Sequence, residues 1–348
     1  MTKSVSAVDL FCGAGGLTHG LRLEGVNVAV GIDLDPTCEY PFEHNNDSEF
    51  LCADVAELTG DSLRDYYPAR AVKLLAGCAP CQPFSTYSQG HRNDADDRWT
   101  LLRHFARLIK ELRPELVTME NVPKLRDHEV FTDFVQTLKD LAYHVTYQVV
   151  DCREYGIPQN RKRLVLLASQ LGEIELQKPT HAKKDFVPVR QVIGRLEKLA
   201  AGSISKRDPL HRTSALREKN LERIRASKPG GTWRDWDKKL VADCHNQRSG
   251  KTYPSVYGRM SWDKPAPTIT TQCYGFGNGR FGHPEQDRAI SLREAALFQT
   301  FPPDYAFAEP DDPISFRKTG RLIGNAVPVK LARVIAQSIL THLKRVSL

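Results

Sequence analysis

Two cysteines three residues apart occur in the stretch GCAPCQPFS, residues 77–85. The spacing of Cys78 and Cys81 is found in zinc sites, in redox pairs and around nucleophilic thiols. A structural zinc ion needs four ligands, and the other six cysteines form no second C-x-x-C pair. A thioredoxin-like pair is disfavoured because the chain of 348 residues is much longer than that fold and has a glycine-rich turn first. The pattern therefore favours a nucleophile without a metal.

A carboxylic acid follows the next predicted strand. The strand at 71–77 runs into the cysteine stretch, and the strand at 116–119 runs into Glu120. Loops that follow parallel strands open on the same edge of a sheet, so Cys81 and Glu120 can face one ligand. A thiolate beside a proton donor is an arrangement for covalent catalysis. For Glu120 alone, capping of a strand or helix is the alternative interpretation.

The first predicted strand ends in a glycine-rich turn, DLFCGAGG, which contains Gly13, Gly15 and Gly16. Asp33 ends the second predicted strand twenty residues after Gly13, a spacing that suits a nucleoside whose ribose hydroxyls bind the acid. The turn does not follow the G-x-G-x-x-G pattern, so it favours a nucleoside such as S-adenosylmethionine over a pyrophosphate. A purely structural tight turn is the alternative.

The elements that must position these residues alternate between strands and helices. Apolar runs predict strands, and apolar residues at helical spacing predict helices. Because the two types alternate, we predict an α/β fold with a doubly wound, mostly parallel sheet and a second, smaller, loop-rich domain. The predicted strands are 7–11, 26–33, 71–77, 116–119, 144–150 and 163–169, and the clearest helices are 101–112, 131–142, 291–301 and 327–343.

The positive charge of the chain is concentrated in one segment. Residues 181–287 hold 21 Lys and Arg against 11 Asp and Glu, whereas the rest of the chain is slightly acidic and the net charge is +7. Trp and Tyr side chains are interspersed with these cations, as on nucleic-acid surfaces, although a solvated basic face is the alternative. We therefore predict one domain at 1–180 plus 310–348 and a second, basic domain at 181–309, for which nucleic-acid binding and a solvated face both stay open.

The composition also bears on location. The chain has 41% hydrophobic residues, no apolar stretch of signal-peptide length, and no run near the roughly 18 residues of a membrane span. Its eight scattered cysteines do not form a disulfide framework. We expect a cytoplasmic, monomeric protein that makes no contact with membranes.

Six motifs in register resemble those of the DNA (cytosine-5)-methyltransferases of bacteria and phages. They are DLFCGAGG, GCAPCQPFS, ENV, GIPQNRKR, SLREAALFQTFP and RLIGNAVP, and together they cover nearly the whole chain. The resemblance implies a methyl transfer from S-adenosylmethionine to C5 of a cytosine flipped out of duplex DNA, leaving 5-methylcytosine and S-adenosylhomocysteine. It implies no metal. It also implies that the domain at 1–180 plus 310–348 is the catalytic and cofactor-binding domain, and that the domain at 181–309 is the target-recognition domain that binds DNA.

The resemblance also assigns roles to residues. Cys81 corresponds to the nucleophile that adds to cytosine C6, and Glu120 to the group that engages N3 and the amino edge. Cys78 has no catalytic counterpart, and we interpret it as a small buried side chain. The remaining residues carried over are Arg161 and Arg163 at the active site, and Phe11, Gly13, Gly15, Asp33, Leu34, Asp54 and Asn325 at the cofactor.

The expected DNA contacts are Ser85 and Arg98, in the stretch that in this family closes over the flipped base, and Arg259, Thr268 and Arg280 in the basic segment. The stretch after Cys81 departs from the commoner Gly-Lys pattern, and a surface loop without this role fits its composition equally well. Arg259 and Arg280 can read guanine edges, or they can brace loops through carbonyl groups.

Two other functions stay open. The same motifs occur in the branch of the family that methylates transfer RNA, although the large basic segment favours duplex DNA. A catalytically inert DNA-binding regulator would need the loss of Cys81, Glu120 or the glycine turn, and all three are present. The motifs do not indicate whether a genetically linked restriction endonuclease accompanies the enzyme.

Overall fold

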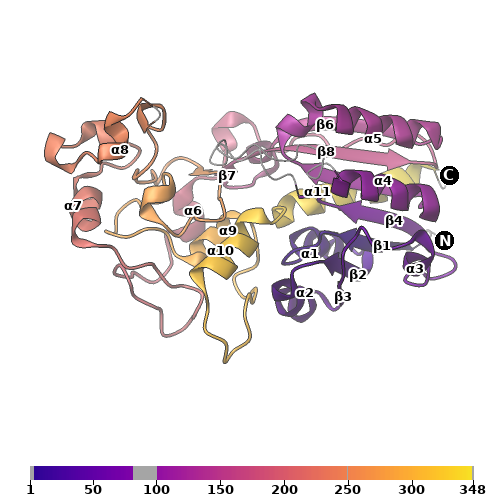
Figure 1. The fold of residues 1–348 in the computed structure, drawn as a ribbon, viewed down its shortest axis with the longest axis horizontal. Coiled ribbons are helices and arrows are strands. Elements are labelled where there is room, and N and C mark those ends of the chain that lie inside the picture. The colour runs from indigo at the N-terminus through magenta and orange to yellow at the C-terminus, as the bar shows by residue number, and fades with distance from the viewer. Residues whose placement is uncertain (1–3, 81–99, 249, 347–348) are drawn as a thin grey trace. The chain divides into compact units, whose positions relative to one another are not determined.

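The computed structural model describes residues 4–80, 100–248 and 250–346, and the chain divides into two compact units (Figure 1). The first unit comprises Met1–Asp151, Lys162–Pro179 and Val327–Leu348, and the second comprises Cys152–Arg161 and Thr180–Ala326. Residues 152–161, 180 and 310–326, which the predicted boundaries place in the first domain, therefore lie in the second unit. The roles predicted for the two domains remain predictions.

The first unit is built on a seven-stranded sheet with the strand order β3-β2-β1-β4-β5-β8-β6. The first five strands in this order, β3, β2, β1, β4 and β5, are parallel to one another. Strand β8 runs antiparallel to both of its neighbours, β5 and β6. The predicted α/β fold with a mostly parallel sheet is confirmed. The elements of this unit are β1 (Val5–Leu10), α1 (Gly16–Leu23), β2 (Asn27–Asp33), α2 (Glu39–Asn46), β3 (Glu49–Cys52), α3 (Gly60–Arg64), β4 (Val72–Gly77), α4 (Thr100–Leu112), β5 (Leu116–Asn121), α5 (Glu129–Asp140), β6 (His144–Asp151), β8 (Lys162–Ser169) and α11 (Val329–Val346).

One strand of this sheet was missed from the sequence. Strand β3 has only four residues, and only Phe50 among them is buried. A strand this short contains too few residues to show the period-two alternation by which strands are recognised. It forms the edge of the sheet and pairs with β2 alone.

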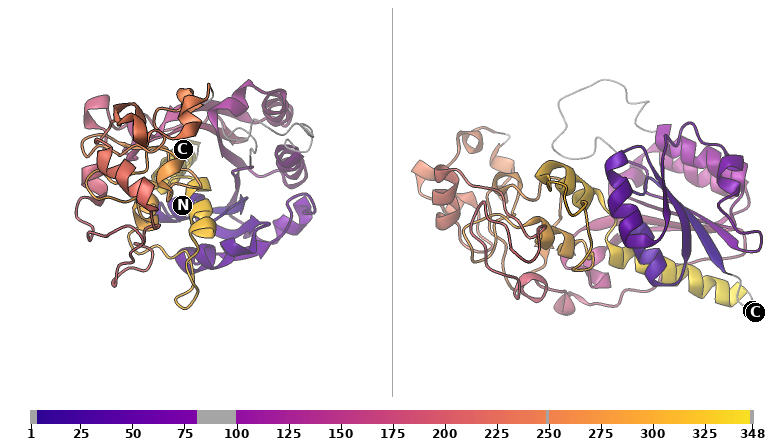
Figure 2. Two further views of the ribbon diagram at one scale, coloured as in Figure 1. Left: turned by 60° about the vertical axis from the view of Figure 1, so that its left-hand side comes forward. Right: turned by 90° about the horizontal axis from the view of Figure 1, so that it is seen from below.

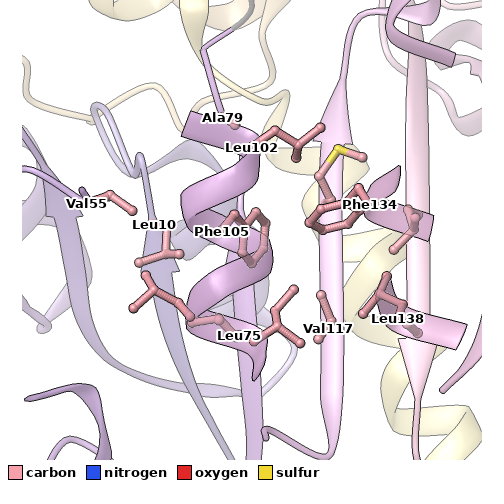
Figure 3. Packing of buried hydrophobic residues seen from close by; sticks show 14 of the residues in the cluster. Leu10, Val55, Leu75, Ala79, Leu102, Phe105, Val117, Phe134 and Leu138 are labelled. Atoms are coloured by element: carbon pink, nitrogen blue, oxygen red, sulfur yellow. The ribbon is translucent and has the colours of Figure 1, made fainter. Parts of the chain in front are cut away.

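Helices cover both faces of the sheet (Figure 2). On one face, Leu10, Leu75 and Val117 from three neighbouring strands pack in one cluster with Phe105 of α4 and Phe134 of α5 (Figure 3). The two phenyl rings are 5.4 Å apart. These apolar side chains stabilise the sheet because burying each one removes its surface from water, at roughly 1.5–3 kcal/mol per side chain.

The other face holds α1 and α11, which pack closely on each other. Asp9 points to this face because alternate residues of a strand point to opposite sides, and it accepts a hydrogen bond from Thr18 of α1. The helices approach closely at Gly20, where an added Cβ would lie only 2.3 Å from the Cβ of Ala332. Among the described residues, no helix is both long and apolar enough to cross a bilayer.

The second unit consists mainly of loops and short helices, as predicted. Its two-stranded sheet pairs β7 (Gln159–Asn160) with β9 (Ala266–Pro267), which joins the GIPQNRKR motif to the basic segment. One of its small cores contains Trp233, Trp236 and Leu240. Its helices are α6 (Val189–Ile193), α7 (Glu218–Ala226), α8 (Asp243–Asn246), α9 (Leu292–Phe298) and α10 (Phe316–Asn325).

Candidate active site

The turn after β1 has a backbone that favours glycine. Phe11, Gly13 and Gly15 have positive φ angles of 58°, 54° and 80°. This left-handed conformation is easy for glycine and uncommon for a residue with a side chain such as Phe11. A Cβ added to Gly13 would meet no atom of the described residues within 4 Å, so the space beside this turn is open.

Asp33 is attached to that turn by a hydrogen bond. Its Oδ2 accepts the backbone N–H of Gly13 at 3.0 Å, and its Oδ1 accepts the N–H of Asp35 at 3.0 Å. Burial raises the pKa of Asp33, and the two backbone hydrogen bonds act in the opposite direction. The next residue, Leu34, is 66% exposed. A fixed carboxylate and a free apolar surface therefore lie side by side at the end of β2.

Asp54 follows β3, at the same edge of the sheet as the turn after β1 and the end of β2. The N–H of Ala53 donates to the carbonyl of Asp33, and the Asp54 carboxylate accepts the N–H of Ala56 at 2.9 Å. The carboxyl ends of β1, β2 and β3 thus gather the predicted cofactor residues of the first unit. Asn325, the last residue of α10, is exposed and belongs to the second unit.

Strand register brings Cys78, Glu120 and Arg163 together. Gly77 pairs with Met119 in the parallel ladder of β4 and β5, so Cys78 lies beside Glu120. In the antiparallel ladder of β5 and β8, Glu120 pairs with Val165. Arg163 is on the same face of β8 as Val165, which makes it a diagonal neighbour of Glu120.

The Glu120 carboxylate has a different neighbour at each oxygen. The thiol of Cys78 donates to Oε2 at 2.6 Å, and the Nε of Arg163 lies 2.8 Å from Oε1. Glu120 is only 4% exposed, and Oε1, although it forms the ion pair with Arg163, accepts no hydrogen bond from the described residues. A ligand donor can bind this oxygen beside the guanidinium, because a carboxylate oxygen has more than one lone pair.

Two of these features were missed from the sequence. Cys78, which the sequence analysis describes as a small buried side chain, is only half-buried, and its thiol has a polar partner in Glu120. Asp9 is fully buried in β1, and its Oδ1 accepts no hydrogen bond from the described residues. Burial raises the pKa of Asp9 to about 7, an effect that the Thr18 hydrogen bond opposes. An acid within the apolar run AVDLF was the available signal for this unusual carboxyl group.

Arg161 is part of a buried polar network in the second unit. Its guanidinium donates to the carbonyl groups of Ile269 at 2.8 Å, Gly324 at 3.3 Å and Ala326 at 3.4 Å. Gln159, two residues earlier, accepts the N–H of Ile269 and donates to the carbonyl of Phe298. These bonds join three of the six motifs to one another and to the segment that follows β9, and they fix the Arg161 side chain through backbone carbonyl groups.

The three predicted DNA contacts in the basic segment have internal partners. Arg259 is 5% exposed, and its guanidinium donates to the carbonyls of Ile224, His283 and Gln286 and to the carboxylate of Asp287. Arg280 donates to the carbonyls of Gly231 and Arg259, and Thr268 to that of Asn160. These contacts favour the alternative in which Arg259 braces loops through carbonyl groups, because contact with a base would break several buried hydrogen bonds. Cys81, Ser85 and Arg98 lie outside the described residues.

The comparison with protein families defines the class of this enzyme. The family model for C-5 cytosine-specific DNA methylase matches residues 5–341, nearly the whole chain. The chain therefore belongs to the C-5 cytosine-specific DNA methylases, a family of DNA methyltransferases. The family expected from the six motifs is confirmed.

Individual relatives agree with this assignment. The chain is 54% identical over 337 residues to the type II methylase M.HgiDII of Herpetosiphon aurantiacus, covering 96% of this chain and 94% of that protein. It is 30% identical over 346 residues to the type II methyltransferase M1.HphI of Haemophilus parahaemolyticus, covering 97% and 87%. In fold it is similar to a DNMT2 mutant of Spodoptera frugiperda, with a TM-score of 0.66, 17% identity, and coverage of 97% of this chain and 100% of that one.

Proposed function

We propose that the protein methylates C5 of a flipped-out cytosine in duplex DNA through a covalent bond between Cys81 and C6. C5 of cytosine is a poor nucleophile, and addition of a thiolate to C6 moves electron density onto C5. The observation that carries the proposal is the buried carboxylate of Glu120, which has an unsatisfied Oε1 and stands at the sheet edge next to the Cys78 loop. The amino group of cytosine donates to that oxygen, and N3 donates to it once N3 is protonated.

The fold and family imply S-adenosylmethionine as the methyl donor, and the turn after β1 fits it. We propose that the open space beside Gly13 admits the nucleoside, that Asp33 accepts its ribose hydroxyls, and that Leu34 covers one face of the adenine. Phe11, Gly15, Asp54 and Asn325 are the further proposed contacts. The cofactor supplies an electrophilic methyl group on a sulfonium.

Arg163 and Arg161 have different proposed roles. Arg163 forms an ion pair with the Glu120 carboxylate and so holds this group beside the base. The Arg163 side chain is only 13% exposed. Arg161 supports the site indirectly, because its hydrogen bonds go to the backbone of Ile269, Gly324 and Ala326. This modifies the direct active-site role that we predicted for Arg161.

We further propose that the second unit recognises the target in duplex DNA, with Ser85 and Arg98 as additional contacts. Flipping the cytosine costs a few kcal/mol, which contacts to the DNA offset. The relatives named above are type II methylases, so we propose that the methylation belongs to a restriction-modification system.

A transfer assay with radiolabelled S-adenosylmethionine tests this function. Wild-type protein should label duplex DNA in preference to transfer RNA, and DNA containing 5-fluorocytosine should form a covalent complex with it. Cys81→Ser should abolish both reactions, whereas Cys78→Ser, the matched control in the same stretch, should retain them. Preferential labelling of transfer RNA would assign the chain to the RNA-modifying branch, and full activity of Cys81→Ser would disprove the covalent mechanism.

A further inference from the structure

Cys78 lies directly against Glu120. It follows the last residue of β4, and its Sγ lies 2.6 Å from Oε2 and 3.2 Å from the backbone carbonyl of Glu120. Two contacts with the same residue come from the register of β4 and β5, in which Gly77 pairs with Met119. Nothing in the covalent mechanism proposed above requires a thiol at this position.

The protonation state makes the thiol a donor. Burial raises the pKa of the Cys78 thiol well above its usual value of about 9, and the adjacent carboxylate of Glu120 raises it further. Arg163 lowers this pKa, but by less. The thiol is therefore neutral at pH 7 and carries one proton, which an ionised carboxylate accepts.

The thiol makes the two carboxylate oxygens inequivalent. Oε2 receives the S–H hydrogen bond, whereas Oε1 is buried, lies 2.8 Å from the Arg163 Nε, and accepts no hydrogen bond from the described residues. A carboxylate fixed at one oxygen cannot rotate freely about its last torsion angle. Because this torsion is otherwise broad, a hydrogen bond to one oxygen fixes the orientation of the carboxylate plane.

We propose that Cys78 is a positioning residue of the methyl transfer: its thiol holds Oε2 of Glu120 so that Oε1 is presented to the cytosine. This inference rests on the proposed function of Glu120. A fixed geometry matters here because small displacements of a catalytic group greatly reduce the rate.

The hypothesis that Cys78 only fills space predicts a different result. If only volume matters, Cys78→Val should preserve turnover, and Cys78→Ala should reduce stability without a specific kinetic effect. If the donor matters, both Ala and Val should reduce turnover, while Cys78→Ser should restore most of it because a hydroxyl also donates.

The experiment compares kcat, KM for DNA and cofactor affinity for wild type, Cys78→Ala, Cys78→Val and Cys78→Ser. We expect kcat to fall about 10- to 100-fold in Ala and Val, the range for a lost hydrogen bond to a charged group, with cofactor affinity retained. Val72→Ala, which removes buried volume at the other end of β4, is the matched control and should lower the melting temperature without lowering kcat.

A double-mutant cycle with Glu120→Gln distinguishes positioning from a structural role. If Cys78 acts through Glu120, the effect of Cys78→Ala on kcat should largely disappear in the Glu120→Gln background. Wild-type kcat in Ala and Val, or a Ser variant as impaired as Ala, would overturn the proposal. A wild-type protein that neither methylates duplex DNA nor forms the 5-fluorocytosine complex would refute the proposed function itself, and the role of Cys78 with it.

Discussion

Glu120 combines burial, an ion pair and a thiol hydrogen bond in one side chain. Each of these restricts the carboxylate: the thiol donates to Oε2, and Arg163 forms an ion pair with Oε1, the oxygen that accepts no hydrogen bond from the described residues. Burial excludes competing water and strengthens the remaining electrostatic interactions. The arrangement suits a group that must hold a base edge and exchange a proton with it.

Replacing this carboxylate by an amide tests its role. Glu120→Gln retains the volume and part of the hydrogen bonding but removes the acid, so turnover should fall by roughly 10² to 10⁴. Cofactor affinity, measured by calorimetry, should stay close to that of wild type. Unchanged turnover would exclude Glu120 as the acid–base group.

Asp9 should make the stability of the protein depend on pH. Its pKa is raised from 3.8 to about 7 in the folded protein, so between these values the folded state retains a proton that the unfolded state releases. The free energy of unfolding should therefore decrease as the pH rises from about 4 to about 7, by roughly 1.4 kcal/mol per pH unit. Cys12 and Asp33 are the neighbouring titratable groups in this part of the site.

Denaturant unfolding of wild type and Asp9→Asn between pH 5 and pH 8 measures this effect. The variant should gain stability relative to wild type as the pH rises, because an amide has no proton to lose. A constant difference in stability between Asp9→Asn and wild type over this pH range would contradict a raised pKa of Asp9.

At the scale of secondary-structure elements, the register of the strands determines which site residues become neighbours. Cys78 and Glu120 are 42 residues apart in sequence, and the ladder of β4 and β5 makes them neighbours. The ladder of β5 and β8 adds Arg163 from the other side. In the second unit, the short pairing of β7 and β9 similarly attaches Arg161 to the segment around Ile269.

The loops of the second unit depend on a buried arginine, which leads to a prediction about folding. Arg259→Ala should remove one donor from each of the carbonyls of Ile224, His283 and Gln286 and the ion-pair partner of Asp287, and should destabilise the second unit by several kcal/mol. Loss of DNA binding should then accompany a lower melting temperature.

Arg280, which is half-buried, serves as the comparison. Arg280→Ala should weaken duplex binding or relax site choice with a smaller change in melting temperature and normal cofactor affinity. The measurements are thermal unfolding and methylation of cognate and single-mismatch duplexes at fixed salt. An Arg259→Ala protein with wild-type stability and altered site choice would contradict the bracing role.

The two structural units also differ in charge. The segment 181–287 carries the basic surplus and lies within the second unit, whereas the turn after β1 and the Glu120 group belong to the first. DNA binding and cofactor binding should therefore respond differently to salt. Exposed cations bind phosphates with release of counterions, and a nucleoside bound by hydrogen bonds and apolar contact releases far fewer.

Titrations of duplex DNA and of S-adenosylmethionine between 50 and 200 mM salt provide the test. The logarithm of duplex affinity should fall linearly with the logarithm of salt, with a slope of about −0.9 for each phosphate neutralised, while cofactor affinity should change little. Equal salt dependence for the two ligands would contradict this separation of charge.

The sequence by itself determined the alternating α/β pattern, the family and the positions of the chemical motifs. These are local properties, because hydrophobic periodicity and glycine turns are written into neighbouring residues. The tertiary structure decided which side chains meet. It paired the Cys78 thiol with Glu120, placed Arg163 on the other oxygen, buried Arg259 among carbonyl groups, and added β3 at the sheet edge. Such contacts depend on strand register and on loop packing across tens of residues, and a one-residue shift in register would point the same side chains to the opposite face.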